Sequence, residues 1–347
     1  MDRVLVVDDS ALVRQVLTAE ISKDPELEVV GAAPDPYVAR QMIAELRPDV
    51  ITLDIEMPRM DGLTFLTKLM QHHPLPVVII SSLSEHGSRT ALEAVSRGAV
   101  EVIHKPVSSY SVGNAIESVV GAVKTAARAK VQPIIPPAAP PKLADTSKAT
   151  RLIAIGGSTG ATQVIERMLV NFPADSPPIL IAQHMPPTFT GHFAKRLDTI
   201  CQMHVVEAQD GDPLERGKVL IAPGSHHMLL RGSADQHYVL LSDGNKVNGH
   251  RPSVDELFRS VAKHSGPHAV GAILTGMGCD GAQGMLEMRA AGATTFAQDA
   301  DSCVVFGMPK EAIKLGAAQE VLPICQMSDA LMQASANASN KQLAVTH

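Results

Sequence analysis

Short apolar segments alternate with longer amphipathic segments along the first 127 residues of the chain. A short apolar run between turn residues is typical of a buried strand, and apolar residues spaced three and four apart indicate a helix. We therefore expect strands at 4–7, 28–32, 50–53, 77–80 and 100–103, and a last helix over 111–127. Strands that alternate with helices predict a parallel sheet with helices on both faces, the doubly wound α/β arrangement.

The same alternation returns after residue 150. The pattern predicts strands at 152–155, 179–183, 204–208, 218–222, 238–242, 270–274, 293–297 and 320–322. It also predicts helices that begin at Gln163, Thr188, Ser253, Gly281 and Pro309, with Ser253 and Glu256 forming a capping box. The second half is therefore expected to be another doubly wound α/β domain.

A proline-rich segment separates the two patterns. Prolines at positions 133, 136, 137, 140 and 141 prevent a helix and favour an extended, semi-rigid linker. We expect a first domain at 1–127, a linker at 128–149, a second domain at 150–335 and a disordered tail at 336–347.

Composition narrows the classes of partner. The chain has 347 residues, of which 45% are hydrophobic and 19% charged, an ordinary composition for a folded protein. Its net charge is −6 and it has no basic cluster, so nucleic acid is disfavoured as a partner. The four cysteines show no C-x-x-C spacing, so neither a disulfide framework nor a thiolate zinc site is expected. No apolar stretch approaches the roughly 20 residues that span a membrane, so we expect no membrane insertion and a cytoplasmic monomer.

The second domain opens on a glycine-rich turn. The apolar run at 152–155 ends at the sequence GGSTG at 156–160, and a helical pattern follows at once. In a G-x-S-x-G turn, glycines let the backbone turn sharply and present the serine hydroxyl at the end of a strand. Ser158 is thus a candidate nucleophile, although glycine-rich turns also occur in doubly wound folds without chemistry. A dinucleotide site is disfavoured, because the G-x-G-x-x-G pattern needs glycine where Ser158 stands.

Two further strand ends supply partners for this serine. His184 ends the strand at 179–183, and Asp280 lies in a glycine-rich loop after the strand at 270–274. A serine needs a base to take its proton, and an imidazole base works best when a carboxylate orients it. Helix capping would also explain Asp280, and three other histidines compete with His184 for the role of base: His226, His227 and His250.

The backbone N–H groups of Thr159 and Met277 are candidates for an oxyanion hole. Thr159 follows the candidate nucleophile, and Met277 lies in the turn before Asp280. The order serine, histidine, aspartate along the chain differs from that of α/β-hydrolases, so the same constellation would be built on a different fold.

Polar side chains also follow the predicted strands of the first domain. Asp8 and Asp9 follow the first strand, Asp54 the third, Ser81 the fourth and Lys105 the fifth. Three carboxylates that meet at one sheet edge repel each other unless a cation lies among them, and oxygen ligands suit Mg²⁺. An aspartate that accepts a phosphoryl group needs such a site, with a lysine and a hydroxyl to bind the phosphoryl oxygens.

These residues resemble the two-component receiver domain over residues 1–127. The matching positions are the Asp8-Asp9 pair, the sequence DIEMPRMDGL at 54–63, Ser81 and the Lys105-Pro106 pair. The resemblance implies phosphorylation at Asp54, Mg²⁺ binding by Asp8, Asp9, Asp54 and the Glu56 carbonyl, and sensing of the phosphoryl group by Ser81 and Lys105.

Val102 departs from the receiver pattern. Many receivers have an aromatic residue three positions before the lysine, and this chain has Val102 there. We therefore expect the phosphorylation signal to pass through Ser81 and the helix over 88–97.

The second half resembles the C-terminal domain of the chemotaxis protein-glutamate methylesterase. The matching sequences are GGSTG at 156–160, QHMPP at 183–187, IAPG at 221–224, HRPSVD at 250–255 and TGMGCDG at 275–281. The resemblance implies a catalytic triad of Ser158, His184 and Asp280, without a cofactor, that hydrolyses methyl esters of chemoreceptor glutamates and deamidates receptor glutamines. Ala161 replaces a second glycine found in many relatives.

The expected function is therefore a phosphorylation-activated serine hydrolase in chemotaxis. Its implied partners are a chemotaxis histidine kinase as phosphodonor and methyl-accepting chemoreceptors as substrates, and the unphosphorylated receiver is expected to inhibit the hydrolase. Two alternatives remain open: an esterase or amidase of the same family in another signalling pathway, and a phosphorylation-switched module that binds receptors without chemistry.

Overall fold

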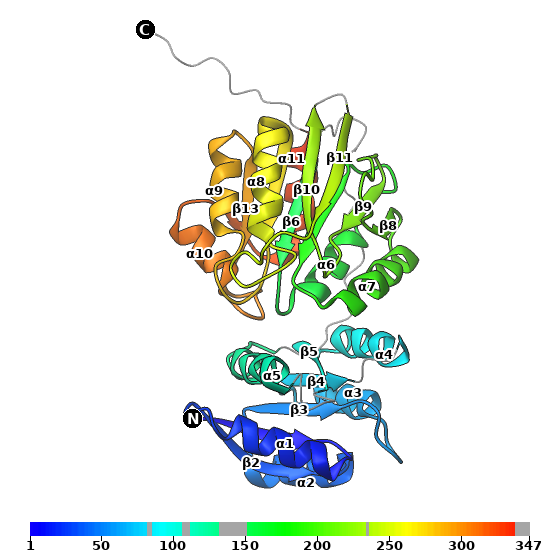
Figure 1. Cartoon of the computed structure of the whole chain (residues 1–347), viewed down its shortest axis with the longest axis vertical. Helices are drawn as coiled ribbons and strands as arrows, with labels where there is room; N and C mark the ends of the chain where they lie inside the picture. The colour runs from blue at the N-terminus through cyan, green and yellow to red at the C-terminus, as the bar shows by residue number, and fades with distance from the viewer. Residues whose placement is uncertain (82–84, 106–111, 132–150, 234–235, 337–347) are drawn as a thin grey trace. The chain divides into compact units, whose positions relative to one another are not determined.

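The computed structural model describes residues 1–81, 85–105, 112–131, 151–233 and 236–336 (Figure 1). The chain divides into two compact units, Met1–Pro136 and Pro137–His347. The predicted linker from residue 132 onward and the predicted tail from residue 337 onward lie outside the described residues. Within the described ranges, no helix combines the length and the apolar character needed to cross a membrane.

The first unit is a five-stranded parallel sheet with the order β2-β1-β3-β4-β5. Helix α1 contacts α5, and α3 contacts α4, as expected when helices cover both faces. The strands are β1 (Asp2–Val7), β2 (Leu27–Ala33), β3 (Val50–Asp54), β4 (Val77–Ser81) and β5 (Glu101–His104). The helices are α1 (Ala11–Ile21), α2 (Pro36–Leu46), α3 (Gly62–His72), α4 (Glu85–Ser96) and α5 (Val112–Ala127).

The second unit contains a seven-stranded sheet with the order β14-β13-β12-β6-β7-β9-β8, and all its strand pairs are parallel. The strands are β6 (Leu152–Gly157), β7 (Ile179–Gln183), β8 (His204–Glu207), β9 (Lys218–Ile221), β12 (Ala269–Ile273), β13 (Thr294–Gln298) and β14 (Glu320–Leu322). The helices are α6 (Ala161–Leu169), α7 (Pro187–Ile200), α8 (Val254–His264), α9 (Ala282–Ala290), α10 (Met308–Lys314) and α11 (Ile324–Ala336), with a short 3₁₀ helix, η2 (Gly266–His268).

Residues on both faces of strand β6 are buried, so the sheet is covered on both sides. Leu152 and Ala154 belong to the apolar cluster that also contains buried residues of α8, α9 and α10. Because side chains alternate along a strand, Ile153 and Ile155 point to the opposite face, where they too are fully buried. The predicted doubly wound architecture is confirmed in both units.

An antiparallel hairpin of β10 (His227–Ser233) and β11 (Gln236–Ser242) lies outside this sheet. The sequence pattern predicted β11 but not β10. Alternate hairpin residues, including Met228, Leu230 and Val239, are buried in the cluster with α8. The hairpin therefore extends the hydrophobic core beside α8 (Figure 1).

Only half of the predicted capping box forms at the start of α8. The Ser253 side chain caps the helix and accepts from the Glu256 N–H at 3.4 Å. The Ser253 N–H donates to Nδ1 of His227 at 3.1 Å, and the Glu256 carboxylate pairs with Arg259. A histidine from the hairpin thus occupies the place that the glutamate was predicted to fill.

Candidate functional site

The candidate site of the second unit lies where the strand order reverses. β6 has β7 on one side and β12 on the other, so the chain continues in opposite directions from the centre of the sheet. Such a reversal leaves a crevice at the carboxyl ends of the strands. Gly157 is in register with Gln183, so Ser158 and His184 are the next residues along two neighbouring strands. The His184 N–H donates to the Gly157 carbonyl at 3.1 Å.

The backbone of Ser158 is held by three neighbouring segments. Its N–H donates to the Thr275 carbonyl at 3.1 Å, and its carbonyl accepts from the Gln183 side-chain amide at 2.9 Å and from the Ala161 N–H at 2.9 Å. Gly160 has a φ of 80°, a region that favours glycine and lets the chain turn at once into α6. These bonds fix the position of the half-buried Ser158 at the end of β6.

The His184 imidazole is bonded to a carboxylate on one side only. Its Nε2 lies 2.8 Å from Oδ2 of Asp280, and its Nδ1 is buried without a hydrogen-bond partner. A neutral imidazole carries one N–H, so donation from Nε2 to the carboxylate leaves Nδ1 as an acceptor. His184 is therefore arranged to take a proton through Nδ1.

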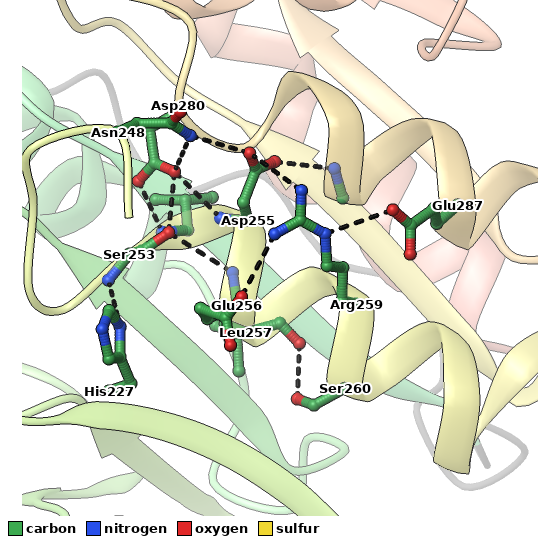
Figure 2. Close-up of polar contacts among 12 residues, drawn as sticks. His227, Asn248, Ser253, Asp255, Glu256, Leu257, Arg259, Ser260, Asp280 and Glu287 are labelled. Atoms are coloured by element: carbon green, nitrogen blue, oxygen red, sulfur yellow. Dashed lines mark hydrogen bonds and ion pairs between the residues drawn. The ribbon is translucent and has the colours of Figure 1, made fainter. Parts of the chain in front are cut away.

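Asp280 accepts hydrogen bonds from the start of α8 (Figure 2). Val254 N–H donates at 2.7 Å, Asp255 N–H at 3.3 Å and the Ser253 hydroxyl at 2.8 Å. Burial opposes ionisation, yet hydrogen bonds from His184, Asn248 and Ser253 hold the pKa of Asp280 well below its usual range. The carboxylate also benefits from the positive end of the α8 dipole.

Asp280 caps α8, and not the helix that follows it in the sequence, α9. The sequence alternative was that Asp280 caps the helix that follows it. The residue at that position is Gly281, which makes no side-chain cap. Asp280 instead satisfies the first N–H groups of α8, and the His184 contact comes in addition to this structural role.

The three competing histidines have other partners. Nδ1 of His226 lies 2.7 Å from the Ser225 hydroxyl, and Nε2 of His227 lies 2.9 Å from the Asn245 carbonyl. The His250 ring stacks on His184, with centroids 3.8 Å apart and an angle of 7° between the planes. Burial and the neighbouring His184 lower the pKa of His250 to about 4, which keeps this ring neutral at ordinary pH. Among these four histidines, His184 is the one bonded to Asp280.

The segments of Thr159 and Met277 both lie near Ser158. The Thr159 carbonyl accepts from the Thr275 hydroxyl at 3.0 Å. Gly276, which precedes Met277, approaches Ser158 so closely that an added Cβ would lie 2.7 Å from the Ser158 Cβ. The Gly276 N–H donates to the Val305 carbonyl at 3.0 Å, which joins this turn to the segment before α10.

The acidic residues of the first unit meet at the equivalent place in its sheet. The order reverses between β1 and β3, and carboxylate oxygens of Asp8, Asp9 and Asp54 lie within 4.8 Å of one another. Asp8 and Asp54 are 1% exposed, whereas Asp9 is open to solvent. Nζ of Lys105 lies 3.1 Å from Oδ2 of Asp8 and 2.7 Å from Oδ2 of Asp54.

This cluster suits a small divalent cation. Burial raises the pKa of Asp54 to about 6, against the opposing effect of Lys105, so the clustered carboxylates are costly to keep ionised. A donor set made of oxygen atoms alone matches the preference of Mg²⁺. Ser81 ends β4 beside this cluster, and its carbonyl accepts from the Lys105 N–H at 2.8 Å.

Several residues around Ser158, His184 and Asp280 were not anticipated from the sequence. Side-chain hydrogen bonds run from Gln183 to the Ser158 carbonyl, from Asn248 to Asp280 and from Thr275 to the carbonyl of Thr159, the residue after Ser158. Gln183 and Thr275 are polar residues that end or closely follow apolar strands, and this pattern in the sequence could have indicated that they lie near the site. Asn248 precedes Gly249, a pair typical of tight hairpin turns, but nothing in the sequence places that turn beside Asp280.

Comparison with known proteins agrees with both halves of this description. A family model for the response regulator receiver domain matches residues 4–117, and one for the CheB methylesterase matches residues 153–331. The protein-glutamate methylesterase/protein-glutamine glutaminase 2 of Syntrophus aciditrophicus is 51% identical and covers 95% of this chain and 98% of its own. The similarly named protein of Salmonella typhimurium is 50% identical, over 95% of this chain and 96% of its own.

A solved structure extends the likeness to three dimensions. The catalytic domain of the Thermotoga maritima CheB methylesterase is 38% identical, covers 53% of this chain and 97% of its own, and superposes with a TM-score of 0.52. The chain combines a receiver domain with a second α/β domain of the methylesterase type. It belongs to the CheB methylesterase family.

Proposed function

We propose that this chain hydrolyses the methyl esters of chemoreceptor glutamates, deamidates receptor glutamines, and is activated by phosphorylation at Asp54. The proposal rests on the contact between Nε2 of His184 and Asp280 at 2.8 Å, which leaves Nδ1 of His184 as an acceptor. His184 and Ser158 directly follow two neighbouring strands, β7 and β6. The names of its relatives support the choice of substrate.

Acylation begins at the Ser158 hydroxyl. Its proton passes to Nδ1 of His184 while Oγ attacks the ester carbonyl carbon, and the Asp280 carboxylate stabilises the imidazolium that forms. The N–H groups of Thr159 and Met277 would bind the developing oxyanion. When the tetrahedral intermediate collapses, the imidazolium protonates the departing oxygen, and methanol leaves an acyl-serine.

Water completes the cycle. Nδ1 of His184 takes a proton from water, whose oxygen attacks the acyl carbon, and the same proton returns to Ser158 Oγ as the serine leaves. The product is a glutamate side chain. With a glutamine substrate the departing group is ammonia, so the same residues would carry out deamidation.

The receiver unit would supply the regulation. Asp8, Asp9, Asp54 and the Glu56 carbonyl are the groups that would hold Mg²⁺, which supplies positive charge beside the phosphoryl oxygens. A histidine kinase of the chemotaxis system would be the phosphodonor. Lys105, which pairs with Asp54, would bind the added phosphoryl oxygens together with Ser81.

Methanol release from membranes that carry methylated chemoreceptors tests the proposed activity. Purified full-length chain with a phosphodonor and Mg²⁺ should release methanol, and ammonia from receptors that carry glutamine. Release from another methylated protein, but not from chemoreceptors, would favour the same chemistry in a different pathway. Receptor binding without release of either product would favour the binding module.

Gly276 provides a first test of the geometry around Ser158. In Gly276→Ala, the new methyl group would overlap Met308 and lie 2.7 Å from the Ser158 Cβ, so the spacing between Ser158 and the Gly276 turn must change. We expect methanol release to fall by about tenfold or more, because small misplacements of reacting groups are costly. In Gly244→Ala the new Cβ comes no closer than 3.3 Å to a neighbour, and this variant should retain the wild-type rate. Equal rates for both variants would contradict this placement of Gly276.

The proposed regulation by the receiver predicts how a truncated chain behaves. If the unphosphorylated receiver inhibits the hydrolase, a fragment that begins near Lys148 should release methanol without a phosphodonor, and faster than the unphosphorylated full-length chain. A tenfold difference corresponds to about 1.4 kcal/mol between inhibited and active states. A fragment no faster than the unphosphorylated chain would mean that the receiver activates instead of inhibiting.

A further inference from the structure

We propose that the tight turn over 247–250 is a positioning element that sets the orientation of His184 and Asp280 toward each other. The turn is closed by two hydrogen bonds, from the Val247 N–H to the His250 carbonyl at 3.0 Å and from the His250 N–H to the Val247 carbonyl at 2.9 Å. Its central residues both have positive φ, 52° at Asn248 and 81° at Gly249, as in the turns that join twisted strands.

The first contact of the turn is made by the Asn248 amide. Nδ2 of Asn248 lies 2.9 Å from Oδ1 of Asp280 and 2.8 Å from Oδ2 of Asp255, so each of its two hydrogens serves one carboxylate (Figure 2). Asp255 and Asp280 are both buried and repel each other. Burial and the charge of Asp280 raise the pKa of Asp255, although the Gly284 N–H and Asn248 oppose this shift. The amide therefore offsets part of this repulsion, together with Arg259, which lies 3.6 Å from Asp255.

The second contact is the His250 ring, two residues further along. It stacks on the His184 ring with a centroid distance of 3.8 Å and nearly parallel planes. Such stacking restricts rotation of the His184 ring about its Cβ–Cγ bond, which is the motion that would break its bond to Asp280. Asn248 thus holds the carboxylate while His250 holds the imidazole, and one rigid turn carries both.

Core packing does not explain these residues. Asn248 and Gly249 are exposed, and an added Cβ at Gly249 would meet nothing within 4 Å. Asn248 nevertheless adopts a left-handed backbone that most side chains avoid, and its amide contacts the two carboxylates. Asparagine before glycine suits the backbone of this turn, whereas the two side-chain hydrogen bonds link the turn to the site.

The test rests on the proposed function and uses the full-length chain in the methanol assay. Asn248→Gly keeps the positive φ and removes the amide, and His250→Ala removes the stacked ring. Each should lower kcat on the order of tenfold with KM unchanged, because hydrogen bonds to charged groups and base orientation act mainly on the reaction step. His250→Phe restores an aromatic face and should recover most of the lost kcat. Asn245→Gly changes an exposed asparagine of the same loop and should keep the wild-type kcat.

Two further measurements separate positioning from a structural effect. In the Asp280→Asn background, Asn248→Gly should cause almost no additional loss, since residues that act through one another are not additive. The low-field proton resonance of the bond between His184 and Asp280 should broaden in Asn248→Gly and His250→Ala, and not in Asn245→Gly. Wild-type kcat and an unchanged resonance in both variants would overturn the proposal. If the wild-type chain released no methanol, the proposed function would fail, and the resonance would still decide the positioning role.

Discussion

Replacing Ser158 with alanine should abolish methanol release while the protein stays folded. The change removes the proposed attacking oxygen, and the acyl intermediate on Ser158 can no longer form. It removes one atom from a half-buried side chain, so little packing is lost. We expect the rate to fall on the order of 10⁴-fold or more, as when a nucleophilic serine is removed from other serine hydrolases.

Ser225→Ala is a matched control for this loss. Ser225 lies in the same unit, and its hydroxyl contacts His226 instead of His184. This variant should retain wild-type methanol release, and both variants should unfold at temperatures close to that of the wild type. Turnover by Ser158→Ala at the wild-type rate would mean that Ser158 is not the nucleophile.

Asp54→Asn should abolish labelling of the chain by a small-molecule phosphodonor such as acetyl phosphate in the presence of Mg²⁺. An amide cannot form the acyl phosphate, and it removes one of the three carboxylates that lie within 4.8 Å of one another. The substitution is close to isosteric, so the buried end of β3 keeps its shape. Incorporated phosphate per chain, measured with a radiolabelled donor, should fall to background.

Asp49→Asn is the control for replacement of an aspartate near β3 that lies away from the acidic cluster. Asp49 directly precedes β3, at the end opposite Asp54, roughly 16 Å away for a strand that rises about 3.3 Å per residue. This control should be labelled like the wild type. Undiminished stoichiometry in Asp54→Asn would move the acceptor to another residue.

The sheets could be predicted because their central strands are buried on both faces. Strands such as β4 and β7 are fully buried and therefore appear in the sequence as unbroken apolar runs. Strand β10 escaped prediction because its second half, Arg231 to Ser233, is polar and only partly buried or exposed. Its place is decided by pairing with β11 and packing on α8, which are contacts between distant segments.

In the candidate site too, some residues could be predicted from local sequence patterns, whereas others depend on contacts between distant segments. Ser158, His184 and Asp280 follow strands, and the geometry of a parallel sheet brings strand ends together at a reversal of order. Asn248 and Ser253 precede Asp280 by 32 and 27 residues and reach it from the loop before α8. No local pattern encodes such an approach, because it depends on how the hairpin and α8 pack against the sheet. The half-formed capping box has the same origin, since His227 arrives from β10.

The bonds from Val254 and Asp255 to Asp280 make the first turn of α8 part of the support of the proposed base. Proteins can open locally at lower free energy than they unfold as a whole, and the burial of Ser253, Val254 and Asp255 makes opening of this helix end costlier than that of an exposed one. When this turn opens, Asp280 loses donors and His184 loses its fixed partner, although the seven-stranded sheet remains folded. Catalytic competence is therefore a measure of the local stability of one helix end. Substitutions that loosen the packing of α8 against the hairpin would be detected by turnover before they are detected by global unfolding.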